Sequence, residues 1–374
     1  MSYSVDAERL LRQFLEFVRI DSPSFEEAKF EEVLTRELAA LGLFAKNDAT
    51  GREGAGNLMA TLPGTDPTLP PILFATHVDT VEPGRGIKPR VEDGIVYTDG
   101  STVLGADNKA AVAATLEAIR YLQAAKPRHG DVEFLYTWGE EQGLLGSAAL
   151  DQAALRSRIG FVVDNHDVSK VVTQAPSQTT LVATYTGKAA HAGSEPEKGI
   201  SAIVAAAQAI AQMPLGRVDF ETTANVGKIN GGSARNAIPE RVVLEGEARS
   251  LDAQKLERQV ATMTAALQAG ADAVGARVEI KWQPQYHGYH LADDSLPVRI
   301  ALAALATLGI DAHTGSMGGG TDGNHLVAKG VPCAVVGVGY AEIHSTRENI
   351  PVENLRRTAE LIVAVAEETA KQAV

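Results

Sequence analysis

The chain has 374 residues, of which 45% are hydrophobic and 22% charged, and its formal net charge is −13 at pH 7. This composition is that of a globular protein, and the length suits two domains or one large domain with an insertion. The acidic balance argues against nucleic acid or an anionic membrane as the main partner. With Cys333 as its single cysteine, the chain has neither a disulfide framework nor a cysteine-based metal cluster.

The start of the chain leads directly into an amphipathic pattern, without the charged and apolar regions of a secretion signal. No run approaches the roughly 20 apolar residues that a membrane helix needs. We therefore expect a cytoplasmic protein that does not insert into a membrane.

The first part of the chain alternates between helical and strand patterns. Apolar spacing predicts a helix over 5–20, and the capping-box pattern from Ser24 to Glu27 predicts the start of a second helix that ends near Gly42. Further elements are predicted as strands at 56–62, 71–77, 132–138 and 160–164 and helices at 107–125 and 145–155. Because the strands are apolar throughout, they indicate an α/β sheet covered by helices.

The pattern changes near residue 178. It predicts strands at 180–187, 222–230, 238–250 and 276–284 and helices at 199–213 and 252–270, the order of a small α+β sandwich. The α/β pattern returns after Pro297, with a helix at 296–308, a strand at 332–338 and a helix at 353–371. We therefore predict one α/β domain made of 1–178 plus 293–374, interrupted by an inserted α+β domain at 179–292.

Five groups of polar residues are candidates for chemistry, and the first is His77 with Asp79. His77 ends an apolar strand, and ligands bind at the carboxyl ends of the strands in α/β sheets. Asp79 points to the same side of an extended chain and is placed to hold the second ring nitrogen. Alone, this pair is explained as well by a hydrogen-bonded histidine at a strand end.

The second and third groups supply carboxylates. Asp107 precedes an Ala-rich helix and is either a metal-bridging carboxylate or an ordinary helix N-cap. Glu140 and Glu141 follow the strand at 132–138, and neighbouring carboxylates repel each other unless cations or protons compensate. One of the two can bind a metal while the other addresses a bound water, and a solvated acidic turn is the alternative.

The last two groups are Asp164, which ends a fourth apolar strand, and His344, which follows the strand at 332–338. Taken together, three carboxylates and two neutral imidazoles would nearly balance two divalent cations plus a hydroxide. Two metals about 3.5–4 Å apart that share a carboxylate are the standard arrangement for hydrolysing acyl or phosphoryl groups. A ligand set without sulfur suits Zn²⁺ and leaves Mn²⁺ or Co²⁺ open.

These motifs, in this order and spacing, resemble the peptidase T branch of the di-zinc aminopeptidase and carboxypeptidase superfamily, which also includes aminoacylases and glutamate carboxypeptidases. The resemblance runs over nearly the whole chain, from His77 to His344. It implies a mixed-sheet zinc-peptidase catalytic domain with an inserted α+β lid and dimerisation domain, two Zn²⁺ per subunit, and a homodimer.

The resemblance also implies a role for each residue of the centre. His77 and Asp164 would bind one metal, and Glu141 and His344 the other. Asp107 would bridge the two metals, and the peptide bond after it is expected to be cis. Asp79 would orient His77, and Glu140 would be the general base that takes a proton from the water and hands it to the leaving amine.

Substrate contacts are implied in the same way. His191 resembles a lid histidine that donates to the developing oxyanion from the partner subunit. The segment from Asn230 to Asn236 resembles one that grips the substrate, and Arg235 suits a carboxylate. Gly319, Gly320 and Thr321 resemble a substrate loop, although a plain sheet-to-helix turn capped by Thr321 or Asp322 explains them equally well.

Two positions depart from the family pattern. Asn108 stands where many relatives have a second Asp, which changes the local charge but removes no ligand. Asp164 is followed by Asn165, His166 and Asp167 instead of a small, glycine-rich turn, so His166 could intrude near the metals or the substrate.

The function that these features predict is a dinuclear zinc exopeptidase that acts on short peptides. An amidohydrolase of N-acyl amino acids or a carboxypeptidase could use the same centre. A catalytically silent binding protein of this fold would be expected to lack Glu140 or a ligand, and every such position is filled. A phosphohydrolase would need a phosphate-binding cradle, which the sequence lacks beyond the glycine loop.

Overall fold

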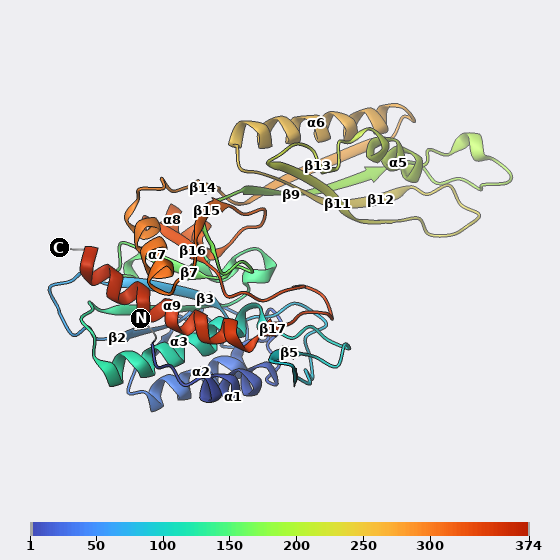
Figure 1. Cartoon of the computed structure of the whole chain (residues 1–374). Coiled ribbons are helices and arrows are strands. Elements are labelled where there is room, and N and C mark those ends of the chain that lie inside the picture. Colours follow the sequence, from blue (N-terminus) through green and yellow to red (C-terminus); the bar gives the residue numbers. More distant parts are fainter. Residues whose placement is uncertain (1–2, 373–374) are drawn as a thin grey trace. The chain divides into compact units, whose positions relative to one another are not determined.

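The computed structural model describes residues 3–372, which form two compact units (Figure 1). The first unit contains the chain up to Gln174, the segment His290–Ser316 and the chain from Thr321 onward. The second contains Ala175–Tyr289 and Met317–Gly320. The structure thus groups the short segment 317–320 with the middle of the chain.

The first unit is built on a nine-stranded mixed sheet with the order β1-β2-β6-β3-β7-β16-β8-β14, and β15 pairs with β8. Its strands are β1 (Ala45–Asn47), β2 (Leu58–Leu62), β3 (Ile72–His77), β6 (Val132–Thr137), β7 (Gly160–Val163), β8 (Lys170–Ala175), β14 (Tyr289–His290), β15 (His313–Ser316) and β16 (Cys333–Val336). The central strands β6, β3, β7 and β16 are parallel. All their residues are buried, as in a sheet covered on both faces.

Helices cover this sheet. They are α1 (Ala7–Val18), α2 (Ala28–Ala40), α3 (Ala106–Ala125), α4 (Leu145–Ala149), α7 (Leu296–Thr307), α8 (Asp322–Ala328) and α9 (Val352–Gln372). Helix α3 lies against β3 and contacts α1 and α9, while α8 contacts β7, β16 and α4. A small sheet of β17 (Ile350–Pro351), β5 (Ile95–Tyr97) and β4 (Arg90–Glu92) lies in the same unit. Within the described residues, none of the helices combines the length and apolar character needed to cross a bilayer.

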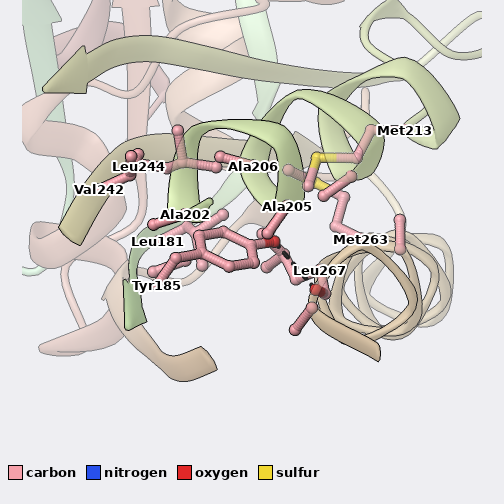
Figure 2. Close-up of a cluster of buried hydrophobic side chains, with 14 of the residues drawn as sticks. Leu181, Tyr185, Ala202, Ala205, Ala206, Met213, Val242, Leu244, Met263 and Leu267 are labelled. Atoms are coloured by element: carbon pink, nitrogen blue, oxygen red, sulfur yellow. Dashed lines mark hydrogen bonds between the residues drawn. The ribbon is translucent and has the colours of Figure 1, made fainter. Parts of the chain in front are cut away.

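The second unit is an antiparallel sheet with two helices. The strand order is β10 (Gly216–Arg217), β11 (Thr222–Gly231), β12 (Arg241–Ser250), β9 (Ser177–Thr186) and β13 (Arg277–Tyr286), and the helices are α5 (Ala202–Gln212) and α6 (Ala253–Asp272). Alternate residues of β9, Leu181, Ala183 and Tyr185, enter its core. Leu181 and Tyr185 are labelled in Figure 2. The Tyr185 hydroxyl donates to the Leu267 carbonyl at 2.9 Å, which satisfies the one polar atom of this side chain.

The mixed sheet and the inserted α+β unit confirm the predicted fold class. Two predicted local features differ from the structure. The capping-box interpretation of Ser24 is wrong, because α2 begins at Ala28 and Ser24 instead donates to Asp79 Oδ2 at 2.7 Å. The helix predicted at 145–155 is two pieces, α4 and a 3₁₀ turn at Gln152–Ala154.

Candidate active site

Four parallel strands deliver polar side chains to one edge of the large sheet. His77 is the last residue of β3, and Asp164 directly follows β7. Glu140 and Glu141 form a 3₁₀ turn after β6, and His344 lies beyond β16. Because neighbouring parallel strands end at the same edge, residues far apart in the chain meet there.

Asp107 lies between two pairs of potential metal ligands. Its Oδ1 is 3.0 Å from His77 Nε2, and its Oδ2 is 3.5 Å from His344 Nε2. Asp164 Oδ1 is 3.8 Å from His77 Nε2, and Glu141 Oε1 is 3.1 Å from His344 Nε2. The N-cap residue of α3 is Gly105, and the φ and ψ of Asp107, −80° and 98°, are not helical. The side chain of Asp107 therefore contacts the two imidazoles and does not act as the N-cap of α3.

Asp79 is fully buried and joins His77 to the glutamate turn. Its Oδ1 lies 3.3 Å from His77 Nδ1 and accepts the backbone N–H of Glu140 at 3.0 Å. Its Oδ2 accepts from the N–H of Glu141 at 3.2 Å and from Ser24 Oγ. One carboxylate therefore holds both the ring of His77 and the backbone that carries the two glutamates.

Mutual repulsion and burial act on the carboxylates of this cluster. Burial raises the pKa of Glu140 well above its usual value, and it also raises the pKa of Glu141. Burial, with the charge of Asp107 nearby, raises the pKa of Asp164 to about 7. So many carboxyl groups in one buried place favour either protons or a bound cation.

The two imidazoles respond to the carboxylates in the opposite direction. Burial opposes the charged form of His77, but hydrogen bonds to Asp107 and Asp79 raise its pKa well above the usual value. Hydrogen bonds to Asp107 and Glu141 raise the pKa of His344 to about 10. Positive charge is thus favoured at both ends of Asp107, where divalent cations would supply it.

The donor set fits a pair of divalent metal ions. Three overlapping groups each bring one nitrogen or oxygen per residue within 4.8 Å of the others: His77 with Asp107 and Asp164, Asp107 with Glu141 and His344, and His77 with Glu140 and Glu141. Among the described residues, His77, Asp107 and Glu141 each belong to two of these groups. Oxygen and imidazole ligands without sulfur are typical of Zn²⁺, Mn²⁺ or Co²⁺ sites.

Known proteins share both the sequence pattern and the fold. Residues 73–368 match the model of peptidase family M20/M25/M40. The chain belongs to this family. A tripeptidase from Staphylococcus aureus is 39% identical and has a TM-score of 0.92, with 98% of this chain and 100% of that chain covered. The aminopeptidase PepT from Bacillus cereus is 44% identical with a TM-score of 0.87, covering 98% and 99%.

Among curated relatives, a Peptidase T from Geobacillus thermodenitrificans is 28% identical over 96% of this chain and 97% of its own length. The resemblance to the peptidase T branch is thereby confirmed, and the chain is an enzyme, a peptidase of the M20 family. The remaining features of the site follow from its own geometry.

Three further residues of this M20 peptidase make contacts at the site that the sequence does not predict. Tyr340 donates its hydroxyl to Asp164 Oδ1 at 2.6 Å. Asn108 donates from Nδ2 to the Val163 carbonyl at 2.8 Å, beside Asp164. Glu348 is buried and accepts backbone N–H groups that precede α3. Apart from the polar identity of these residues, no local pattern indicates these contacts, because each partner is distant in the chain.

Unusual backbone conformations accompany the site. The peptide bond between Asp107 and Asn108 is cis, as the resemblance implies. Glu342 and His344 have φ values of 54° and 59°, in the left-handed region. Non-glycine residues adopt this region at a cost, and such residues cluster at functional sites. The sequence raises the possibility that His166 lies near the metals or the substrate. In the structure it is exposed and belongs to none of the three groups of potential metal ligands.

Two of the segments predicted to contact substrate lie side by side in the second unit. The N–H of Ala192 donates to the Asn236 carbonyl at 2.9 Å, so the segment around His191 lies beside the one that contains Arg235. His191, Asn230, Arg235 and Asn236 are all exposed. His191 Nδ1 accepts from the N–H groups of Gly193 and Ser194, both at 3.1 Å. A neutral ring therefore carries its proton on Nε2, where it can be donated.

The glycine-rich segment has two parts with different surroundings. A Cβ on Gly319 would meet no atom within 4 Å, whereas one on Gly320 would lie 2.3 Å from the ring of Tyr286. Thr321 is fully buried at the start of α8, and its N–H donates to Asn324 Oδ1 at 3.0 Å. This contact is the reciprocal half of a capping box, in which the N3 side chain accepts the N–H of the N-cap residue. Gly319, Gly320 and Thr321 all stay candidates for the substrate loop.

Proposed function

We propose that this M20 peptidase is a dinuclear zinc exopeptidase that removes residues from short peptides. The observation that carries the proposal is the position of Asp107, with one oxygen directed to His77 and the other to His344. Asp164 completes the first group and Glu141 the second. A carboxylate between two such groups is the arrangement that bridges a pair of metal ions.

In this proposal, His77 and Asp164 would hold one ion, Glu141 and His344 would hold the other, and Asp107 would contribute to both. When bound, the two ions would polarise the carbonyl of the scissile bond and make a water molecule easier to deprotonate. The hydrogen bond from Tyr340 to Asp164 orients one of the ligands, and Asp79 orients His77. Mn²⁺ and Co²⁺ are alternatives to Zn²⁺ for the same ligands.

Glu140 is the proposed general base. Its carboxylate is close to His77 and Glu141, yet it is not needed in either group that contains Asp107. Burial raises the pKa of Glu140, which makes its carboxylate a stronger base toward the proton of the attacking water. Glu140 takes a proton from the attacking water and later transfers it to the nitrogen of the leaving amine.

Substrate recognition is assigned to the second unit. His191 offers a proton at Nε2 to the oxyanion that forms at the scissile carbonyl. Arg235, together with Asn230 and Asn236, is suited to a carboxylate of the peptide, and Gly319 and Gly320 to its backbone. These contacts would suit a peptide or an N-acyl amino acid alike. A peptide is favoured because the relatives with 39% and 44% identity carry the names tripeptidase and aminopeptidase.

We further propose that the chain forms a homodimer through its second unit, so that His191 serves the metal centre of the partner subunit. Support comes from large apolar side chains that are exposed on this unit: Val182, Ile203, Val204, Val218, Phe220 and Ile229. Phe220 is 90% exposed. Exposed apolar side chains of this size are common at protein interfaces.

A substrate panel tests the proposed function. Zinc-reconstituted protein is incubated with di- and tripeptides, with the same peptides acetylated at the amino terminus, and with N-acyl amino acids. We expect cleavage of the free peptides and a large loss on acetylation, as for an enzyme that reads the amino terminus. Faster hydrolysis of N-acyl amino acids than of any peptide would instead establish an amidohydrolase, and no cleavage of any compound would contradict hydrolysis altogether.

A further inference from the structure

Glu348 is a buried carboxylate that touches the loop before α3 from a distant part of the chain. Glu348 is 2% exposed. Oε2 accepts the backbone N–H groups of Leu104 and Gly105 at 2.7 and 2.8 Å, and Oε1 accepts the N–H of Asp107 at 2.9 Å. Three donors of one short loop therefore converge on one side chain.

This contact matters because the loop has no regular structure that could satisfy those donors. Gly105 has a φ of 70°, and Asp107 and Asn108 have non-helical backbone angles although they lie at the start of α3. A buried N–H group without a partner is costly, and the first N–H groups of a helix have no partner within the helix itself. Glu348 supplies the missing acceptors at the residue whose side chain lies between His77 and His344.

The segment that holds Glu348 also holds His344. Ala341 and Asn349 pair across its base, with N–H to carbonyl distances of 2.8 and 3.1 Å, and the N–H of Glu348 donates to the Ser345 carbonyl at 3.1 Å. This closed loop therefore presents an imidazole to the cluster and, four residues later, a carboxylate to the backbone of Asp107. The two loops are joined by Glu348.

We propose that Glu348 is a positioning residue of the metal centre, which sets the place of Asp107 relative to His344 through three backbone hydrogen bonds and thereby sets metal affinity. This inference rests on the proposed function, because it assumes that Asp107 binds metal. Glu348 itself contacts neither metal nor substrate in this account. Residues that orient metal ligands in this way typically contribute about 10- to 100-fold to metal affinity.

The test compares Glu348→Gln with Glu133→Gln. Glu133 is a matched control, since it is 6% exposed and accepts the N–H groups of Arg156 and Ser157 and the Ser157 hydroxyl, away from the donor groups. Zn²⁺ affinity is measured by competition with a chelator, and backbone amide exchange is measured over 103–108 in metal-free protein. Both variants replace a buried carboxyl group that holds a loop with an amide of the same size.

We expect Glu348→Gln to weaken Zn²⁺ binding by about 10- to 100-fold and to speed amide exchange over 103–108. Glu133→Gln should leave the Zn²⁺ affinity unchanged even where it lowers thermal stability. If Glu348→Gln does not fold, Glu348→Asp, which keeps the charge on a shorter side chain, should show the same two effects in smaller degree. Zn²⁺ affinity within twofold of wild type in the folded variant would overturn the inference.

The wild-type measurement separates this inference from the proposed function. Wild-type protein that binds two Zn²⁺ per chain and cleaves peptides, beside a Glu348 variant of equal affinity, contradicts the positioning role alone. Wild-type protein that binds Zn²⁺ but cleaves nothing contradicts the proposed activity and leaves the affinity comparison decisive for Glu348. Wild-type protein that binds no divalent ion contradicts both.

Discussion

Asp79 connects the ring of His77 with the turn that carries Glu140, the proposed general base. Asp79 contacts the ring of His77 and accepts the backbone N–H groups of both Glu140 and Glu141. Only the first contact is predictable from the sequence, because a side chain two residues away on an extended strand is a local neighbour. The contacts with the glutamate turn depend on the adjacency of β3 and β6.

Substitution of the proposed base should separate metal binding from turnover. Glu140→Gln keeps the size of the side chain but removes its ability to accept a proton, so we expect kcat to fall by about 10²- to 10⁴-fold. Both metal ions should remain, which metal analysis of the purified variant checks. Wild-type turnover in Glu140→Gln would refute the mechanism, and loss of one ion would make Glu140 a ligand.

Glu31 is a buried carboxyl group outside the proposed metal centre, and we expect it to make the free energy of unfolding depend on pH. Burial raises the pKa of Glu31 to about 8 from its ordinary value of 4.5. The folded state therefore holds this proton more tightly than the unfolded chain. The contribution to stability is complete below pH 4.5 and is lost as the pH rises toward 8.

Glu31→Gln cannot ionise and should escape this loss. One pKa unit corresponds to about 1.4 kcal/mol, so the loss avoided at pH 8 is on the order of a few kcal/mol. We expect Tm of the metal-free variant minus Tm of the wild type to increase from pH 5 to pH 8. A difference that stays constant over this range would show that Glu31 does not titrate as its burial implies.

At the scale of elements, the sequence predicts the strands that carry the site more accurately than the short elements around them. The strands that end at His77 and before Asp164 are continuous apolar runs, which burial on both faces requires. Strands β4, β5 and β17 have only two or three residues each, too few for an apolar run to distinguish them from loops. Ser24 has the local pattern of a helix cap, but its contact with Asp79 prevails.

The second unit depends on the close approach of its two helices. A Cβ on Gly270 of α6 would lie 2.4 Å from the Ala205 carbonyl oxygen of α5 and 2.8 Å from the Ala209 backbone nitrogen. Backbone atoms cannot yield as a flexible side chain does, so Gly270→Ala must push the helices apart. Overpacking of this kind typically costs about 1–3 kcal/mol.

We expect Gly270→Ala to speed amide exchange in α5 and α6 while Zn²⁺ affinity stays at the wild-type level. Gly227→Ala is the control, since its Cβ would meet only the Asn225 side chain, at 3.5 Å. Equal exchange rates in Gly270→Ala and wild type would mean that the helices shift at no cost.

For the whole molecule, the sequence predicts which residues meet but not how they are held. The carboxyl ends of parallel strands indicate a shared edge, so the five ligand candidates can be named from strand positions and from the family resemblance. Tyr340, Asn108 and Glu348 depend on contacts between segments that only the folded chain brings together. The left-handed backbone at His344 likewise follows from the folded loop and not from a glycine in the sequence.

Dimerisation is the expectation at this scale that bears most on activity. If His191 donates to the oxyanion in the partner subunit, His191→Ala should remain a dimer with both metals and lose about 10²- to 10³-fold in kcat. Light scattering gives the mass, and steady-state kinetics give kcat. A fully active monomeric wild type would exclude this role for His191.

The central claim is that Asp107 lies between two metal ions. Diffraction from crystals of the zinc-loaded protein, measured at the zinc absorption edge, locates those ions without reference to activity. We expect two anomalous peaks about 3.5–4 Å apart, one beside His77 and Asp164 and the other beside Glu141 and His344, with Asp107 in contact with both. A single peak, or two peaks that do not share Asp107, would contradict the claim.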